Sequence, residues 1–539
     1  MPAMTSDLPR TITEAARLIE ARALSPVELV RALLERTEMF DPVISSFLTV
    51  TADEALAQAR HAESEIANGR YRGALHGIPF GAKDNYETRG IRTTGHSRVY
   101  EHYVPSVNAG VIDQLYAEGA VLMGKLALHE LAHGGPSFDL PWPPARNPWN
   151  PAHFTGGSSS GSAAALAAGL VHFSLGSDTG GSIRTPASLC GLVGLKPTFG
   201  SVSRYGVIPN SWSLDHCGPL TKSVEDCAIV MDAICEQDPR DRWKASRAGP
   251  SFRAAIADEI KGVRVGVVRH FWEEEGGVNS ELAHATEEAL RVMRALGATL
   301  ETVRLRPVRD YCDVWTIIEA PETFSIQRKA LAERPHEFGS VFLERTLIAC
   351  LIGAADYMDA QRMRERMIEE MEAVWDKYDV LITAGAGPAP PLGPTLAKWP
   401  SLNRYSPFAL LGVPAVVVPS GYSREGLPLS IQLVARAFDD ARLLRVAHAY
   451  ERATRFAEQR EPDLSEAARP KPIAPPNAPG TDASARISSL CEQAASGAGL
   501  TLTDEQLAIL CNAAPHLIEM VQRVRGAAGP AEPAGVFRL

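Results

Sequence analysis

The sequence predicts a mixed α/β protein in which a β-sheet is covered by helices. Short apolar runs with the length of buried strands recur along the chain, at 263–270, 379–383, 414–421 and 429–436. Amphipathic stretches with the period of a helix lie between them, at 280–297 and 355–378. This alternation is typical of helices that pack on a sheet.

The N-terminal part is predicted to be helical. Within residues 25–40, Ser25 and Glu28 have the spacing of a capping box, and Pro26 occupies the first helical position. The segment GIPFGAKDN at 77–85 then predicts a short buried strand that runs into a loop.

The composition changes abruptly near residue 469. Five of the ten residues 470–479 are proline, which cannot donate a backbone hydrogen bond and favours an extended linker. We therefore expect a large domain at 1–465, a proline-rich linker at 466–485 and a small helical segment at 486–539. Residues 503–525 of that segment have a helical, amphipathic pattern.

Charge and composition narrow the functional class. The 539 residues carry a net charge of −10 without a basic stripe, so we expect no nucleic-acid partner. No run of 18 apolar residues occurs, so we expect no membrane partner. The eight cysteines are scattered without a C-x-x-C pair, and the N-terminus has no apolar signal segment, which predicts a cytoplasmic protein.

One candidate site is HELAH at 129–133, which matches the H-E-x-x-H zinc pattern with Glu130 as base. Gly134, Gly135 and Pro136 follow at once, so the helix that would carry both histidines is expected to end there. We therefore favour solvated or capping histidines at a helix end and expect no metal.

A second candidate is GSSSG at 157–161, which matches G-x-S-x-G with Ser159 at its centre. A nucleophile elbow needs a strand directly before the serine, but the preceding residues are rich in proline and glycine. Histidines lie downstream, so a Ser-His-Asp triad remains open, although the missing strand argues against it.

The third candidate combines Lys83, the serine loop at 156–162 and Ser182 in DTGGSIRTP. Residues 156–206 contain 11 of the 43 glycines, and glycine-rich loops let backbone N–H groups converge on an oxyanion. A plain turn or a phosphate-binding loop is the alternative. The loop lacks the G-K-[ST] ending of a P-loop, which argues against a nucleotide.

Several segments together resemble the amidase signature family over most of residues 10–460. They are GIPFGAKDN, RNPWNP, TGGSSSGSAAALAAGL, LGSDTGGSIRTPASLCGLVGLKPTFGSVSRYGV, and LGVPAVVVPSG with GLPLSIQLVA. The resemblance implies a mixed sheet of about eleven strands sandwiched by helices. It also implies hydrolysis of an amide by a Ser–Ser–Lys triad and no cofactor.

By this resemblance Ser182 is the nucleophile, Ser158 the bridging serine and Lys83 the base. Ser158 precedes Ser182 by 24 positions, the spacing usual in the family. A lysine can act as base only when neutral, so burial must lower its pKa from about 10.4 by roughly 3 units. The resemblance further implies a cis peptide bond between Gly157 and Ser158.

The glycine pair before Ser182 has an expected role as well. It lets the N–H groups of Thr179, Gly180, Gly181 and Ser182 curl towards one point, where the oxygen of a tetrahedral intermediate would lie.

Further residues are expected to brace these loops. By the resemblance they are Ser159, Asp178 and Arg184, with ordinary surface polar residues as the alternative. The chain departs from the commoner GGSSGG pattern at Ser160 and Ser162, which we expect to change loop stiffness and not the mechanism.

The sequence indicates the substrate less clearly than the reaction. Segments 100–142 and 303–406 are expected to select it, with Phe138, Trp142, Trp315 and Tyr357 as candidate pocket residues. We expect hydrolysis of a small-molecule amide. The alternative is a urea or carbamate, as in carboxybiuret or allophanate hydrolases.

Two other functions are less favoured. In a tRNA-dependent amidotransferase, the A subunit uses an acidic residue to hold the amino group of glutamine, and residues 398–409 contain none. A non-catalytic binding protein would not need all three triad residues.

The tail, residues 499–525 followed by AEPAGVFRL, resembles the small helical partner subunits of some family amidases, here fused to the chain. A terminal helix that packs for stability is the alternative. We expect the protein to act on its substrate as a homodimer.

Overall fold

The structure is a computed structural model that describes residues 8–245, 251–275, 277–394, 403–475, 480 and 483–527. It contains one mixed sheet of eleven strands in the order β1-β3-β2-β4-β6-β5-β10-β11-β9-β7-β8. The strands are β1 (Phe47–Val50), β2 (Pro79–Lys83), β3 (Val121–Leu126), β4 (Phe173–Asp178), β5 (Val193–Lys196), β6 (His216–Thr221), β7 (Arg264–Val267), β8 (Thr299–Thr302), β9 (Val380–Ala384), β10 (Ala415–Tyr422) and β11 (Pro428–Ala435). The predicted α/β class and strand number are therefore confirmed.

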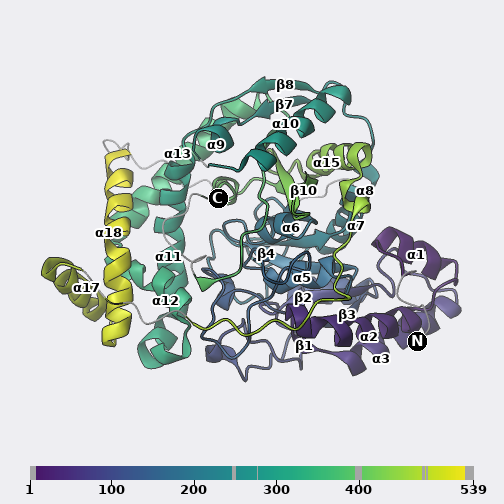
Figure 1. Cartoon of the computed structure of the whole chain (residues 1–539), viewed down its shortest axis with the longest axis horizontal. Helices are drawn as coiled ribbons and strands as arrows, with labels where there is room; N and C mark the ends of the chain where they lie inside the picture. The colour runs from purple at the N-terminus through teal and green to yellow at the C-terminus, as the bar shows by residue number, and fades with distance from the viewer. Residues whose placement is uncertain are drawn as a thin grey trace.

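Helices sandwich this sheet (Figure 1). The longer helices are α1 (Ile12–Glu20), α2 (Pro26–Ile44), α3 (Ala52–Ala67), α4 (Gly110–Ala117), α5 (Ser160–Ala167), α7 (Val224–Ile234), α10 (Ser280–Ala295), α11 (Val308–Glu333), α13 (Ala354–Trp375), α15 (Asp440–Thr454), α17 (Ala485–Gly497) and α18 (Asp504–Ala527). The shorter ones are α6 (Arg184–Leu189), α8 (Phe252–Ala255), α9 (His270–Glu273), α12 (Ser340–Thr346), α14 (Ser406–Leu410) and α16 (Phe456–Gln459). Single 3-10 turns are η1 (Arg98–Tyr100), η2 (Glu130–Ala132), η3 (Pro335–Glu337) and η4 (Leu347–Leu351).

Local sequence signals explain where several elements begin. Ser25 caps α2 by accepting hydrogen bonds from the N–H groups of Val27 and Glu28 at 3.1 and 3.2 Å, with Pro26 at the first helical position. The apolar runs predicted as strands form β2, β7, β9, β10 and β11, all largely buried.

The strand directions determine where a site can form. β2 runs parallel to both β3 and β4, so the carboxyl ends of β2 and β4 lie at the same edge of the sheet. Lys83 is the last residue of β2 and Asp178 the last residue of β4. The β2 and β4 termini therefore bring the lysine segment together with the glycine-rich turn that follows β4.

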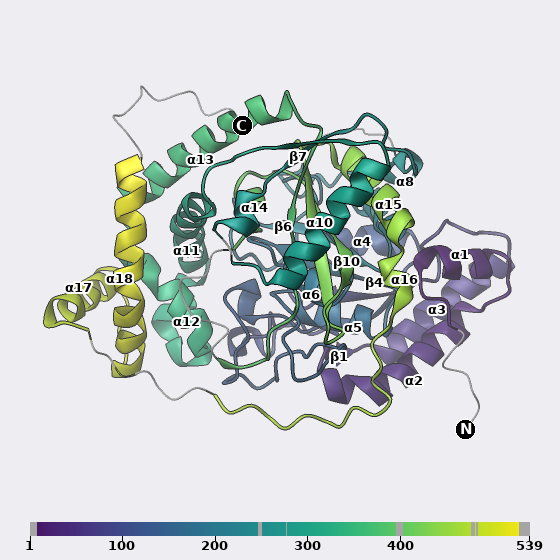
Figure 2. The same cartoon turned by 45° about the horizontal axis from the view of Figure 1, so that its top comes forward.

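A second hydrophobic cluster lies beside the sheet. In both views α11, α12, α13 and α18 gather on one side of the molecule, opposite the N-terminal helices α1–α3 (Figures 1 and 2). Leu517, Val521 and Val524 of α18 are buried in this cluster with residues of α11 and α13. The C-terminal helix therefore shares a core with the larger part of the chain, across a linker whose residues 476–479 and 481–482 lie outside the described ranges.

None of the helices in the described part of the chain is long and apolar enough to cross a membrane. The eight cysteines of these residues are all free.

Candidate active site

Lys83 lies at the centre of a buried cluster of hydroxyl groups. Its Nζ lies 2.8 Å from the Oγ of Ser158 and 2.8 Å from the Oγ of Ser177, and donates to both. Burial lowers the pKa of Lys83 from 10.5 to about 7, although the negative charges of Asp215 and Asp178 oppose the shift. A sizeable fraction of this amine is therefore unprotonated near neutral pH and able to accept a proton.

The serine loop holds Ser158 against this amine. The loop precedes α5, and its Gly157–Ser158 peptide bond is cis, as the family resemblance implies. Ser159 makes three bonds that fasten the loop: its Oγ donates to the carbonyl of Ser177 and accepts from the N–H of Ser177, and its own N–H donates to the carbonyl of Ser182 at 3.2 Å. Ser159 is fully buried, and residues 127–158 before it contain no strand of the sheet. This geometry argues against an elbow with Ser159 as nucleophile.

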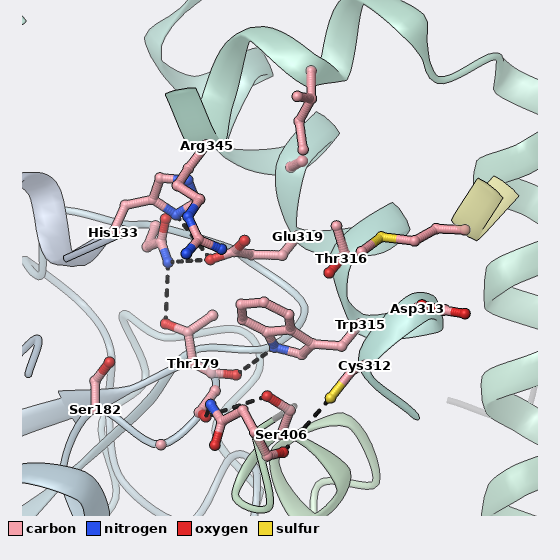
Figure 3. Close-up of a pocket in the computed structure, with 18 of the residues that line it drawn as sticks. His133, Thr179, Ser182, Cys312, Asp313, Trp315, Thr316, Glu319, Arg345 and Ser406 are labelled. Atoms are coloured by element: carbon pink, nitrogen blue, oxygen red, sulfur yellow. Dashed lines mark hydrogen bonds and ion pairs between the residues drawn. The ribbon is translucent and has the colours of Figure 1, made fainter. Parts of the chain in front are cut away.

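Ser182 lies in the turn between β4 and α6 and lines a cavity of about 310 Å³ together with Gly157, Thr179, Gly180 and Gly181 (Figure 3). The N–H groups of Thr179, Gly180 and Ser182 donate no hydrogen bond to any described residue. The N–H of Gly181 differs from the expectation, because it donates to Oδ1 of Asp178 at 2.7 Å. Three of the four expected oxyanion donors therefore have their N–H groups free.

A buried ion pair holds this turn in place. Arg184 donates to both carboxylate oxygens of Asp178, at 3.0 and 2.9 Å, and both side chains are fully buried. Burial alone would raise the pKa of Asp178, but the adjacent Arg184 guanidinium lowers it well below its ordinary value. Arg184 also donates to the carbonyl of Tyr405 and to the amide oxygen of Gln432. The pair thus ties the turn to Tyr405, which directly precedes α14, and to β11.

Helix α11 forms the other wall of the cavity. Trp315 donates from Nε1 to the carbonyl of Thr179 at 2.9 Å, and its ring lies against Gly180, where a Cβ would come within 2.6 Å of it. Glu319 accepts from Asn210 at 2.9 Å and lies 2.9 Å from Nδ1 of His133. In Figure 3 the side chains of His133, Glu319 and Arg345 point towards one another on this wall.

The HELAH segment is built differently from a zinc helix. Residues 130–132 form the single 3-10 turn η2, in which Leu131 and Ala132 have positive φ. His129 and His133 flank this turn with extended backbone, so they do not share one face of an α-helix. Both are buried, with His129 stacked on Phe154, which corrects the expectation of solvated or capping histidines. The described residues contain no group of three or more potential metal ligands.

Residues 28–444 match the Amidase family model. The chain belongs to the amidase family. Its membership supports an enzyme that hydrolyses amides, and the eleven-stranded sheet is the family fold.

Relatives within the family carry different names. The A subunit of glutamyl-tRNA(Gln) amidotransferase from Chloroflexus aurantiacus is 40% identical, over 84% of this chain and 98% of its own length. Among solved structures, the peptide amidase of Stenotrophomonas maltophilia has a TM-score of 0.75 at 29% identity, covering 86% of this chain and 99% of its own. A protein from a vestigial complex linked to the origin of an s-triazine catabolic enzyme has a TM-score of 0.77 at 31% identity, covering 82% and 98%.

These relatives correct the expectation about partners. The expected homodimer, acting on a small molecule without nucleic acid or membrane, is contradicted because similar family members are named as the A subunit of an amidotransferase for glutamyl-tRNA(Gln), and one solved relative comes from a protein complex. The expectation of no nucleic-acid partner rested on the net charge of −10, which describes this chain alone. A charge summed over one chain says nothing of surfaces that other subunits would supply.

The aromatic residues expected in the amidase pocket are only partly there. Trp315 lines the cavity that contains Ser182, whereas Phe138 does not. Trp142 lines a separate cavity beside Phe47 and Leu48. Tyr357 donates its hydroxyl to Glu322 at 2.9 Å outside this cavity. Aromatic character alone could not show which side of a helix faces the cavity.

No motif in the sequence indicated that several other residues line the cavity. Asn210 and Glu319 reach it from segments far apart in the chain, and Arg345 comes from α12. The C-terminal helix α18 contributes Met520 and Arg523, although it lies beyond the family match, which ends at residue 444. Only the folded chain brings these residues together.

Proposed function

We propose that this amidase hydrolyses a carbon–nitrogen amide bond through an acyl-enzyme on Ser182. The observation that carries the proposal is the fully buried Lys83, whose amine lies 2.8 Å from the hydroxyl of Ser158 and has a pKa of about 7. A base with a pKa near the working pH is the kind that catalyses proton transfer well.

In the proposed reaction Ser158 passes a proton from Ser182 to the neutral amine of Lys83. The Ser182 oxygen then attacks the carbonyl carbon and forms the C–O bond of a tetrahedral intermediate. Among the described residues, the Ser182 hydroxyl makes no hydrogen bond to Ser158. We therefore infer that the Ser182 side chain turns towards Ser158 when substrate binds, since such contacts often tighten only in the substrate complex.

The N–H groups of Gly180 and Ser182 would hold the negative oxygen of the intermediate. The proton then returns from Lys83 through Ser158 to the leaving nitrogen, the C–N bond breaks, and ammonia or an amine departs. A water molecule attacks the ester in the second half by the same relay, which releases the carboxylic acid and restores Ser182.

The test compares two neighbouring serines. Purified wild-type protein, Ser182→Ala and Ser159→Ala are assayed for release of ammonia or amine from a panel of amides, ureas and carbamates. We expect Ser182→Ala to lose all measurable turnover with an unchanged fold. Ser159→Ala should lose only part of its activity, because the Oγ of Ser159 fastens the loop and is not the nucleophile. Turnover in Ser182→Ala close to that of the wild type would refute the acyl-enzyme on this residue. Hydrolysis confined to ureas or carbamates would move the substrate class to those compounds.

A second candidate function follows from the relatives. Because the A subunits of two glutamyl-tRNA(Gln) amidotransferases are 37% and 40% identical to this chain, it could release ammonia from glutamine within a larger assembly. Residues 403–409 contain no acidic side chain, and Glu319 in the cavity is already bonded to His133 and Asn210. Glutamine hydrolysis by the wild type, absent in Ser182→Ala, would support this function over that of a general amidase.

A further inference from the structure

The C-terminal helix α18 lies at the cavity that contains Ser182, on the far side from it. Glu519, Met520 and Arg523 of this helix line the cavity together with Ile348 of η4 and residues of α11. In Figure 3 the yellow ribbon of α18 passes beyond Asp313, whereas Ser182 lies on the opposite side of Trp315. A helix attached through a proline-rich linker thus forms part of the wall of the candidate active site.

Two ion pairs fix this helix against the wall. Arg523 donates to both carboxylate oxygens of Asp313 on α11, at 2.6 and 3.0 Å. Arg525 donates to both carboxylate oxygens of Asp356 on α13, at 2.6 and 3.1 Å. Both aspartates are buried, and bidentate pairs of this kind fix orientation as well as distance.

Met520 lies where its side chain would contact a bound substrate. It is 4% exposed and belongs to the hydrophobic cluster of α11 and α13, yet it also lines the cavity. Ile348 and Ala320, both buried, line the same space. A flexible apolar side chain at such a place contacts apolar groups of varied shape.

We propose that α18 is the distal wall of the substrate cavity and that Met520 selects amides by the apolar part remote from the scissile bond. This inference rests on the proposed acyl-enzyme at Ser182. It assigns a selective role to a segment outside the family match. An amide with an extended aliphatic chain would reach Met520, whereas acetamide would fill only the region next to Ser182.

The test compares amides with acyl chains of different length as substrates of the full-length protein. Values of kcat/KM for acetamide and hexanamide are measured from ammonia release for the wild type, Met520→Trp and Met520→Ala. A larger side chain narrows the distal end, so we expect Met520→Trp to lower the hexanamide-to-acetamide ratio about tenfold or more, mainly through KM. Met520→Ala widens the distal end and should not lower the hexanamide-to-acetamide ratio.

Val521→Ala is the matched control. It changes α18, but Val521 does not line the cavity, so thermal unfolding should change while the ratio stays that of the wild type. A ratio unchanged in Met520→Trp, or changed equally in Val521→Ala, would overturn the inference. If the wild type hydrolyses no compound of the amide, urea and carbamate panel, the proposed function is refuted separately.

A binding experiment tests the inference even if the wild type hydrolyses none of these compounds. Ser182→Ala, alone and combined with Met520→Trp, is titrated with hexanamide and acetamide by ligand-observed NMR. We expect Met520→Trp to weaken the binding of hexanamide and to leave that of acetamide unchanged. Equal effects on both ligands would count against a distal wall made by α18.

Discussion

Lys83→Met tests whether the buried amine titrates as the structure implies. The substitution replaces the ammonium by an apolar group of similar length and leaves the hydroxyls of Ser158 and Ser177 without this partner. If Lys83 is the base, the variant should lose about a thousandfold in kcat. In the wild type, kcat/KM should rise with pH through the pKa of about 7 and then level off, since only the neutral amine accepts a proton. At about pH 6 it should be about a tenth of its plateau value.

The same pKa predicts how stability depends on pH. Between the unfolded value of 10.5 and the folded value of about 7, the unfolded chain binds a proton at Lys83 that the native state does not. The wild type therefore loses stability as pH falls through that window, by about 1.4 kcal/mol for each pH unit, and the loss levels off below about pH 7. Over the whole window this amounts to about 5 kcal/mol.

Lys83→Met has no amine to titrate. The difference in free energy of unfolding between the variant and the wild type, measured with denaturant at each pH, therefore gives the contribution of Lys83. From about pH 9.5 to about pH 7.5, the free energy of unfolding of the variant should gain about 3 kcal/mol relative to the wild type. Ser182→Ala is the control, because it is inactive yet retains Lys83 and should follow the wild-type stability profile. A pH-independent difference between Lys83→Met and the wild type, or wild-type activity that is flat between about pH 6 and pH 8, would refute the reasoning.

Two further substitutions test the loop that carries Ser182. Gly180→Ala places a Cβ 2.6 Å from the ring of Trp315, so we expect kcat to fall about a hundredfold as the loop shifts, while Gly393→Ala, with no atom within 4 Å of the new Cβ, should be neutral in the same assay. Arg184→Met leaves its carboxylate partner buried without a counter-charge, and unfolding in urea should show a loss of about 3–5 kcal/mol. Arg264→Met removes a solvent-exposed arginine from its ion pair, and its unfolding midpoint should stay close to that of the wild type. Equal losses in Arg184→Met and Arg264→Met would show that the buried pair does not brace the turn.

The sequence by itself determined the fold class and the segments that form the site. Strand-length apolar runs alternate with helical ones, and a buried run in the extended conformation satisfies its backbone hydrogen bonds by pairing in a sheet. The segments around Ser158 and Ser182 could also be predicted as site loops from their glycine and serine motifs. A backbone that bends sharply favours glycine, so such bends can be recognised in the sequence. These signals are local, so one chain is enough to read them.

Tertiary structure decided which side chains share the cavity. The parallel pairing of β2 with β4 places Lys83 next to Ser177, 94 positions away in the chain. Tertiary structure also directed the N–H of Gly181 to Asp178, which the sequence pattern had counted among the oxyanion donors. The sequence also could not tell which aromatic residues line the cavity: Trp315 does, and Tyr357 does not.

The C-terminal helix shows this division most clearly. Its amphipathic pattern predicted a helix, because the period of apolar residues is a property of one segment. That Met520 and Arg523 reach the wall opposite Ser182 depends on how α18 packs on α11 and α13 and on the ion pair between Arg523 and Asp313. Contacts between segments some 200 positions apart arise only from the packing of the whole chain, and no local period encodes them.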